Sequence, residues 1–354
     1  MITTLWGRLK ISRFRRRCHQ CQTQAQFWGD ESLDESGCTP LLLQRTEALA
    51  LETSYLTSQK LLAQWGVEIS SSQIAELSQG FEAKQQQLCE AKLFELAELP
   101  LSKSKIVARV WMIEIDGMFM PTRGTSEDVT SGTPYKEVKS VVLYMKNTPS
   151  QRYQVSTSKT VADFEPLVHG LLRFAGMTQN DVLIGLSDGA VWITNLMANL
   201  GVKRHILDVY HAATYFQNLL GGLGWEEKAK EQERRCLLRG EFDVQKWLNW
   251  NITPTTLAKV NTDPVAKTAL LYLENQSRLL KTDYKRFKEE GFEVIGSGEV
   301  EGSNKSVLAR RLRISGARWG DGGDGKAFAR GMDASVRPIL DFDAIRLTAF
   351  PQAA

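Results

Sequence analysis

Two aspartates stand where apolar runs of the sequence stop, and their side chains are the ones best suited to chemistry. Asp116 follows the run that ends at Ile115, and Asp188 follows the run 182–186 and a serine. Each aspartate precedes a glycine, and Asp-Gly is also a common turn pair, so either one alone is compatible with an ordinary turn. At the ends of two neighbouring strands, however, two carboxylates can converge on one metal ion.

A third carboxylate is expected from a helix in the segment 296–312, which offers Glu299 and Glu301. At about 3.6 residues per turn, Glu301 shares a face with Leu308, which must pack inward. Glu299 shares a face with Arg310, which points to solvent. This argument selects Glu301. The alternative is that both acids merely occupy a first turn, where the helix dipole favours negative charge.

Three carboxylates with no other evident ligand suit a hard cation that prefers oxygen, which means Mg²⁺ or Mn²⁺ rather than Zn²⁺. Two such ions, about 3.5–4 Å apart, would activate a water or a 3′-hydroxyl and stabilise the leaving oxygen of a phosphodiester. The predicted site is therefore Asp116, Asp188 and Glu301 around two Mg²⁺ ions, and its predicted chemistry is phosphoryl transfer.

The elements that must position these acids alternate between strand and helix. Their order, β-β-β-α-β-α-β-α, predicts a mixed sheet with helices on its faces, and it is the connectivity of the RNase H-like α/β fold. β-branched runs predict strands at 106–115, 137–145, 152–157, 181–186 and 205–209, and helical periodicity predicts helices at 162–175, 190–200 and 211–220.

Composition divides the chain into five segments. They are a basic, cysteine-containing segment (1–40), a helical region (41–104), the first part of the RNase H-like core (105–220), a helical segment rich in charge and Trp (221–290), and the last part of the core with the acidic helix and a tail (291–354). In the fourth segment, Trp247 and Trp250 are three apart and are expected to share a packing face, with stacking on a nucleic-acid base as the alternative.

The helical region 41–104 contains a pattern typical of a helix-turn-helix. A helix through Leu61 meets Gly66, and Ser70-Ser-Ser72 can cap a second helix through Ile74. In that second helix Gln73 and Ser78 are candidate exposed readers of DNA bases. An ordinary helical hairpin is the alternative.

The 354 residues, 42% apolar and 24% charged, are typical of a soluble globular protein. No apolar run approaches the roughly 18 residues that span a membrane, and no signal peptide is evident, so we expect a cytoplasmic protein. A net charge of +3 does not by itself indicate a polyanionic partner. Two basic clusters are expected to contact phosphates, unless they are simply solvated: Arg15, Arg16 and Arg17, and Arg310, Arg311, Arg313 and Arg318.

The five cysteines do not make a disulfide framework. Cys18 and Cys21 form half of a zinc site, and Cys38 is a possible third ligand. Since no fourth ligand is evident nearby, we expect thiols here, with zinc left open.

Several motifs in one order carry a resemblance to a known family. They are Ile115-Asp-Gly117, Ser187-Asp-Gly-Ala-Val-Trp-Ile193, Ile206-Leu-Asp-Val-Tyr-His-Ala212, and Ile295-Gly-Ser-Gly-Glu-Val-Glu301 followed by Arg310-Arg-Leu-Arg-Ile-Ser-Gly-Ala-Arg-Trp319. The sequence resembles DDE transposases of bacterial insertion sequences, of the ISKra type, which are related to the Mutator-like superfamily. The resemblance implies that 221–290 is an all-helical insertion between the second acid and the Glu.

The same resemblance implies an activity and partners. Such an enzyme binds the terminal inverted repeats of its element, cleaves the DNA at the element ends and joins the 3′-hydroxyl to target DNA, as a homodimer or higher oligomer near the bacterial nucleoid. Asp208-x-x-His211 resembles a family signature near the site, and Asp208 is the second choice as a metal ligand. Asp208 could instead be an ordinary helix N-cap. Two other functions stay open: an RNase H-like nuclease that cleaves without joining, and an inactive transposase-derived DNA-binding protein.

Overall fold

The computed structural model describes residues 2–4, 7–9, 15–17, 20, 24–26, 38–103, 107–122, 135–146, 148, 150–239, 241, 243–276, 279, 284–292, 296–313 and 319, without the side chains of 2–17, 24–26, 40, 79–85 and 311. The chain divides into two compact units. One comprises 1–91, 120–136 and 307–354, and the other comprises 92–119 and 137–306.

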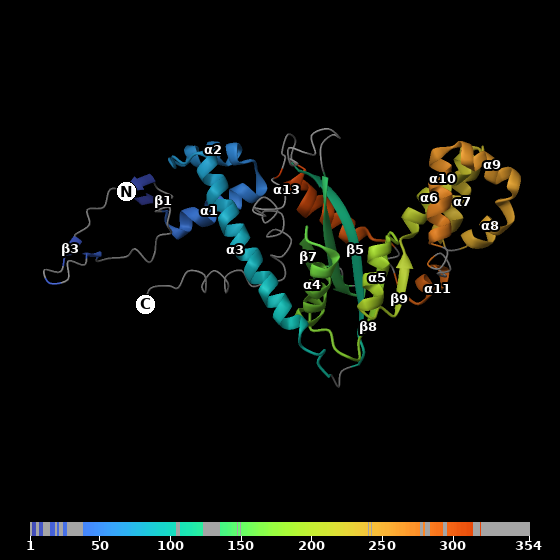
Figure 1. Ribbon diagram of the computed structural model, residues 1–354, viewed down its shortest axis with the longest axis horizontal. Helices are drawn as coiled ribbons and strands as arrows, with labels where there is room; N and C mark the ends of the chain where they lie inside the picture. The colour runs from blue at the N-terminus through green and yellow to red at the C-terminus, as the bar shows by residue number, and fades with distance from the viewer. Residues whose placement is uncertain are drawn as a thin grey trace. The chain divides into compact units, whose positions relative to one another are not determined.

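The second unit is a mixed α/β structure built on a five-stranded sheet (Figure 1). Its strands run in the order β7-β6-β5-β8-β9, with β5, β8 and β9 parallel and β6 antiparallel to β7. The strands are β5 (Val110–Pro121), β6 (Tyr135–Met145), β7 (Arg152–Thr157), β8 (Val182–Ser187) and β9 (Arg204–Leu207). The predicted mixed sheet is confirmed, and the element order is the one that the sequence predicts.

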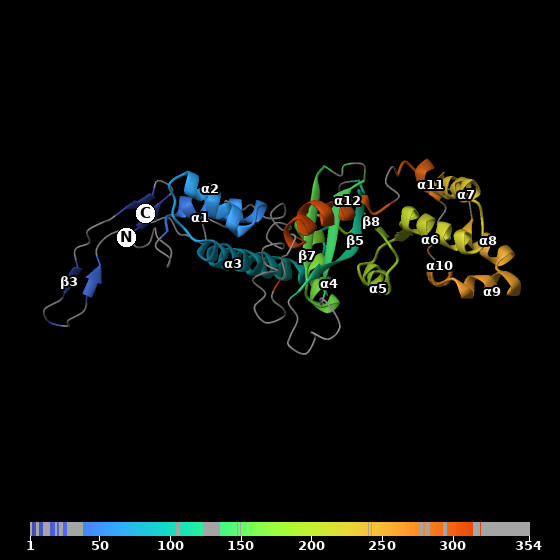
Figure 2. The same cartoon turned by 90° about the horizontal axis from the view of Figure 1, so that it is seen from above.

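Helices cover both faces of the sheet. In Figure 2, α12 lies on one side of the strands, and α4 and α5 lie on the other. These helices are α4 (Val161–Phe174), α5 (Val191–Asn199) and α12 (Gly298–Ser303). α4 begins with a capping box in which Thr160 and Asp163 satisfy each other's backbone N–H groups, and this cap fixes where the helix starts.

A group of helices gathers beyond β9, at the end of the sheet (Figure 1). They are α6 (Val209–Gly222), α7 (Glu227–Arg239), α8 (Val244–Asn251), α9 (Pro254–Thr262), α10 (Pro264–Asn275) and α11 (Tyr284–Glu289). Their apolar faces form one core with the sheet, which includes Phe216, Leu273 and Phe287. Apart from α6, these elements lie in the segment for which the sequence predicted a helical insertion.

The two tryptophans of α8 do not both pack in the core. Trp247 packs edge-on against Phe216, with ring centroids 5.0 Å apart, and also contacts Trp225. Trp250, by contrast, is 82% exposed. The expectation of a common packing face is wrong because the buried stripe of α8 runs through Val244 and Leu248. At about 100° per residue, Trp250 lies far from both of these positions.

The N-terminal part of the first unit contains three described helices around a small apolar core. They are α1 (Pro40–Glu52), α2 (Tyr55–Gln64) and α3 (Ser71–Ala97), the last of which belongs to the second unit from residue 92 onward. Leu42, Leu62 and Ile74 are fully buried in this core. Two short antiparallel strand pairs precede them: β1 (Ile2–Thr4) with β2 (Gly7–Leu9), and β3 (Arg15–Arg17) with β4 (Gln24–Gln26).

The observed strand β5 is longer than expected. The sequence predicted a strand that stops before Asp116, but β5 continues through Asp116 and Gly117 to Pro121. The Asp-Gly pair is therefore part of a strand and not a turn. β8 pairs with β5 only as far as Glu114, so β6 is the neighbouring strand beside which β5 continues through Asp116 and Gly117.

Within the described part of the chain, no helix combines the length and apolar character needed to cross a lipid bilayer.

Candidate metal centre

Three aspartates lie in one row across the parallel part of the sheet. The register pairs Val110–Glu114 of β5 with Val182–Leu186 of β8, and continuing it by two residues sets Asp116 beside Asp188. β8 and β9 are also parallel, and continuing their register by one residue sets Asp188 beside Asp208. Neighbouring strands are about 4.8 Å apart, so the register brings the three side chains to adjacent positions.

Asp116 is half-buried, and the charges of the other two predicted acids affect its pKa. Its Oδ1 accepts a hydrogen bond from the amide of Gly117, and its Oδ2 accepts one from Nδ2 of Asn304, each at 2.8 Å. Burial raises the pKa of Asp116, and the negative charges of Asp188 and Glu301 raise it further against the effect of these hydrogen bonds. Asp116 therefore lies within electrostatic range of both other predicted acids.

Asp188 is held by its backbone, in the turn that directly follows β8. Gly189 has a φ of +83°, a left-handed conformation that favours glycine, and the amide of Ala190 donates to Asp188 Oδ1 at 2.9 Å. Two side chains of α10 fix the same turn. The Tyr272 hydroxyl donates to the carbonyl of Asp188, and the Gln276 amide donates to the carbonyl of Gly189, both at 2.7 Å. The helices beyond β9 thus position the second acid.

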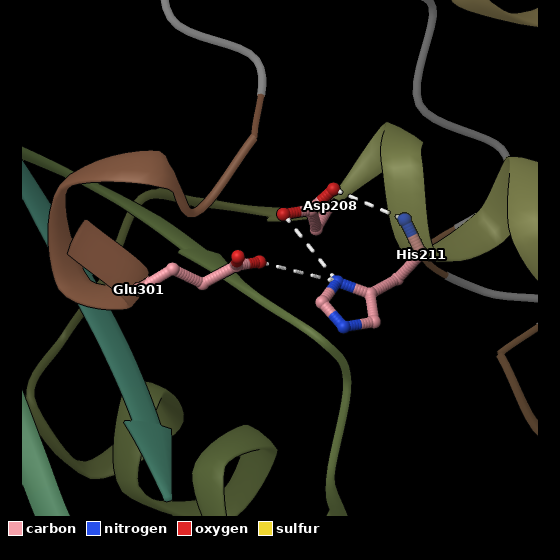
Figure 3. Close-up of side chains that lie close together, drawn as sticks. All are labelled: Asp208, His211 and Glu301. Carbon is pink, nitrogen blue, oxygen red and sulfur yellow. Dashed lines mark hydrogen bonds and ion pairs between the residues drawn. The ribbon is translucent and has the colours of Figure 1, made fainter. Parts of the chain in front are cut away.

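Glu301 reaches the site from α12 and lies beside Asp208 and His211 (Figure 3). Among the described residues, these three form a group whose potential ligand atoms all lie within 4.8 Å of one another. Nδ1 of His211 lies 3.5 Å from the carboxylate of Asp208 and 3.9 Å from that of Glu301. The interaction with Asp208 raises the pKa of His211, and the charges of Glu301 and Asp188 add to this against the opposing effect of burial.

Asp208 is buried, and both of its carboxylate oxygens accept hydrogen bonds. Oδ1 accepts the amides of Tyr210 (2.7 Å) and His211 (3.2 Å), so Asp208 is the N-cap of α6. Oδ2 accepts the amide of Ser297 at 2.6 Å and its hydroxyl at 2.5 Å. Burial disfavours the charged form of Asp208 and raises its pKa. The hydrogen bonds from His211 and Ser297 have a larger, opposite effect, and the pKa is lowered to about 2. Asp208 thus ties α6 to the residue before α12.

The helix that carries Glu301 changes its winding after one and a half turns. α12 ends at Ser303, a π-helical segment spans Asn304–Ala309, and a short helix, α13 (Arg310–Leu312), follows. A π-helix has more residues per turn than an α-helix, so an α-helical period counted back from Leu308 does not apply through it. Glu299 accordingly does not face open solvent: it is partly buried and ion-paired with Arg152 at 2.7 Å.

Several residues at the site were not singled out from the sequence. They contact either one of the acids or α12, the helix that carries Glu301, and they are Glu114, Tyr272, Ser297 and Asn304. Only Glu114 had a usable signal, because it is an acid within an apolar strand and lies two residues from Asp116, on the same face of the sheet.

The residues predicted to contact DNA are only partly described. Arg310 forms an exposed ion pair with Glu52 at 3.1 Å, and Arg313 is exposed. The backbone of Arg15, Arg16 and Arg17 forms β3, and the side chain of Arg311 and all of Arg318 lie outside the described residues. Of the possible zinc ligands, Cys18 and Cys21 also lie outside them, and Cys38 is buried in the core of α1, α2 and α3.

The predicted turn between two helices is present in the first unit. α2 is followed by Gly66 at a φ of +76°, and α3 begins at Ser71. Gln73 is exposed at the start of α3, where it exchanges hydrogen bonds with Ser70 as in a capping box. Ser78 is buried, so its prediction as an exposed base reader is wrong. Ser78 lies four residues after the core residue Ile74 and therefore on the same face of α3.

Among solved structures, the chain is similar to one titled "Drosophila P element transposase strand transfer complex". The TM-score is 0.30 and the identity 9%, over 87% of this chain and 80% of that one. No protein-family model matches the chain, and no curated protein matches it. Because a TM-score this low does not establish a common fold, the case for a function rests on the acidic residues themselves.

The contacts of the two glutamates lead to a first prediction. Glu301→Gln should reduce metal-dependent activity more than about 100-fold, beyond the about 10- to 100-fold that changes outside the ligand shell typically cause. Glu299→Gln should stay within about tenfold of the wild type, because Glu299 is engaged by Arg152. Cleavage of labelled DNA in Mg²⁺ measures both. A larger loss of activity in Glu299→Gln than in Glu301→Gln would identify Glu299 as the third acid of the site.

The hydrogen bonds of Asp208 lead to a second prediction. Asp188→Asn should weaken divalent-metal binding more than Asp208→Asn, because both oxygens of Asp208 already accept protein donors. Asp208→Asn should instead lower the thermal unfolding midpoint, since its amide nitrogen cannot accept the amide and hydroxyl of Ser297. Mn²⁺ titration and thermal unfolding of the two variants measure these effects. Equal losses of Mn²⁺ affinity would make Asp208 a metal ligand.

Proposed function

We propose that this protein is a DDE transposase that cleaves and joins DNA by phosphoryl transfer dependent on divalent metal. The observation that supports the proposal is the placement of three acids. Continuing the parallel register sets Asp116 in β5 beside Asp188, directly after β8, and Glu301 in α12 lies near enough to act on the charge of Asp116. The strand order β7-β6-β5-β8-β9, with the first strand of the unit at the centre, supports an RNase H-like core. The motifs shared with the transposase family support the choice of DNA as substrate.

The chemistry of the donor set fits Mg²⁺ or Mn²⁺. Asp116, Asp188 and Glu301 offer carboxylate oxygens, which hard divalent cations prefer. Within the described residues, Oδ1 of the buried Asn304 has no hydrogen-bond partner, while its Nδ2 is bonded to Asp116. A cation held by the acids would also offset the repulsion that raises the pKa of Asp116. The three acids would hold two ions, with Asp208 as the alternative ligand.

Bound metal ions would supply an activated water or 3′-hydroxyl and stabilise the leaving oxygen of the phosphodiester. The protein's own groups prepare the site for this chemistry. His211 is partly exposed, and its Nδ1 lies 3.5 Å from Asp208 and 3.9 Å from Glu301, so its ring stands at the edge of the site where it could contact a DNA phosphate. Tyr272 and Gln276 hold the turn of Asp188 in one conformation, so that the acid is positioned before DNA binds.

Recognition of DNA is assigned to separate parts of the chain. We assign recognition of the terminal inverted repeats to the region 41–104. Gln73, at the exposed start of α3, would contact the DNA bases. Arg310, Arg313 and the remaining arginines of the two basic clusters would contact phosphates of the repeats and of target DNA. Synapsis of two ends would require a dimer or a higher oligomer.

The central test is the loss of one acid. Asp116→Ala should abolish Mg²⁺-dependent cleavage of repeat-end DNA while DNA affinity stays within about threefold, because acids position ions and basic residues supply affinity. Cleavage and strand-transfer assays on gels, together with fluorescence anisotropy for binding, measure these properties. A variant that retains more than a few per cent of wild-type cleavage would refute the assignment. Cleavage without joined products in the wild type would indicate a nuclease on the same core.

A separate prediction concerns sequence recognition. Gln73→Ala should reduce the preference of the full-length protein for repeat over random DNA, with a loss of stability of at most about 1 kcal/mol because it removes the bonds from Ser70 to the Gln73 side chain but keeps the Ser70 cap. Gln64→Ala, at an exposed position at the end of α2, is the matched control and should change neither property. Competition gel shifts and urea unfolding measure the two effects. An unchanged preference in Gln73→Ala would move recognition away from the start of α3.

A further inference from the structure

Glu114 is a carboxylate fully buried in the middle of the sheet, and the chemistry proposed above does not use it. It lies in β5, two residues before Asp116, and its side chain is on the same face of the sheet. A buried acid is costly unless its oxygens accept hydrogen bonds. For Glu114 the donors come from two different elements, and one of them is the helix that carries Glu301.

The hydrogen bonds of Glu114 join β6 to the first turn of α12. Oε1 accepts the hydroxyl of Tyr144 at 2.6 Å. Oε2 accepts the amides of Glu299 and Val300, each at 2.9 Å. These amides belong to the first turn of α12, where N–H groups have no partner within the helix. Ser297, at the N-cap position, makes no side-chain capping bond, so Glu114 supplies from the sheet the acceptor that a capping residue normally supplies.

This arrangement fixes the place of the third acid more directly than packing alone. α12 has six residues before the winding changes at Asn304, so it is too short to be held rigidly by its own hydrogen bonds. Glu301 directly follows Val300, whose amide Glu114 accepts. A shift of this first turn relative to β5 would therefore move Glu301 relative to Asp116.

We propose that Glu114 is a positioning residue that caps the first turn of α12 from within the sheet and thereby sets the distance of Glu301 from Asp116 and Asp188. The proposal rests on the proposed function, since it assumes that these three acids hold divalent metal. It makes the affinity for metal depend on the reach of the Glu114 side chain and on its ability to accept hydrogen bonds, and not on its charge.

Two variants separate reach from charge. Glu114→Asp keeps the charge but is shorter by one carbon–carbon bond, about 1.5 Å, so its carboxylate cannot bond both Tyr144 and the amides of α12. Glu114→Gln keeps the reach. Its amide oxygen can accept the Glu299 and Val300 amides, and its amide nitrogen can donate to the Tyr144 hydroxyl oxygen.

Asp181 provides a matched control for general loss of stability. It lies just before β8, at the opposite end of the strands from the acids, and accepts hydrogen bonds from Arg109, Trp111 and Thr178. Asp181→Asn weakens a multiply bonded carboxylate of the same sheet without touching α12. Any effect of Glu114 variants that Asp181→Asn reproduces is therefore structural.

The experiment measures Mn²⁺ binding to metal-free full-length protein by electron paramagnetic resonance, with cleavage of repeat-end DNA measured in parallel. Glu114→Asp should weaken Mn²⁺ binding about tenfold, whereas Glu114→Gln and Asp181→Asn should stay within about threefold of the wild type. Thermal unfolding verifies that each variant folds.

Each outcome either supports or overturns the proposed role of Glu114. The proposal would be overturned if Mn²⁺ affinity fell equally in both Glu114 variants, or only in Glu114→Gln. It would also be overturned if Mn²⁺ affinity did not fall in a folded Glu114→Asp. If Glu114→Asp does not fold, Glu114→Gln still decides, because a weakened Mn²⁺ affinity in that variant assigns the effect to charge. Wild-type protein that neither binds Mn²⁺ nor cleaves DNA would instead refute the proposed function, which is a distinct result.

Discussion

The parallel register of β5, β8 and β9, continued past β8 and β9, brings Asp116 of β5, Asp188 after β8 and Asp208 after β9 to adjacent positions. Burial raises the pKa of Asp116, and repulsion by the negative charges of Asp188 and Glu301 raises it further. Glu301 adds a fourth carboxylate to the same place. The polar contacts of the surrounding helices are best understood as the means by which the fold holds this repulsive group together.

The four acids are held in different ways, and the differences separate their roles. Both oxygens of Asp208 accept protein donors, and its pKa is lowered to about 2, so it is stably charged and serves to connect two helices. Asp116 has one side-chain donor, Asn304, and Asp188 is held chiefly through its backbone carbonyl. The carboxylates of Asp116 and Asp188 thus retain more capacity to bind a cation than that of Asp208 does.

The helices beyond β9 contribute to the site as well as to the core. Tyr272 stacks on Tyr215, with ring centroids 3.8 Å apart, and its hydroxyl reaches the carbonyl of Asp188. The hydroxyl of Tyr284 reaches the carbonyl of Leu207, next to Asp208. Because these bonds are made to backbone carbonyls at the ends of β8 and β9, a change in the packing of these helices would be transmitted to the acids.

The sequence by itself determined the kind of sheet and the order of its elements, because apolar periodicity is a local feature. It did not determine the end of β5, which continues through Asp116 beyond the residues that pair with β8. It also did not reveal the surroundings of Glu299, because the π-helical segment after Ser303 interrupts the α-helical period. Ser78 was misplaced because burial depends on which face of α3 meets the core. Glu114, Asn304 and Tyr272 emerged only from the tertiary structure, since each meets its partner across a long stretch of sequence that no local pattern records.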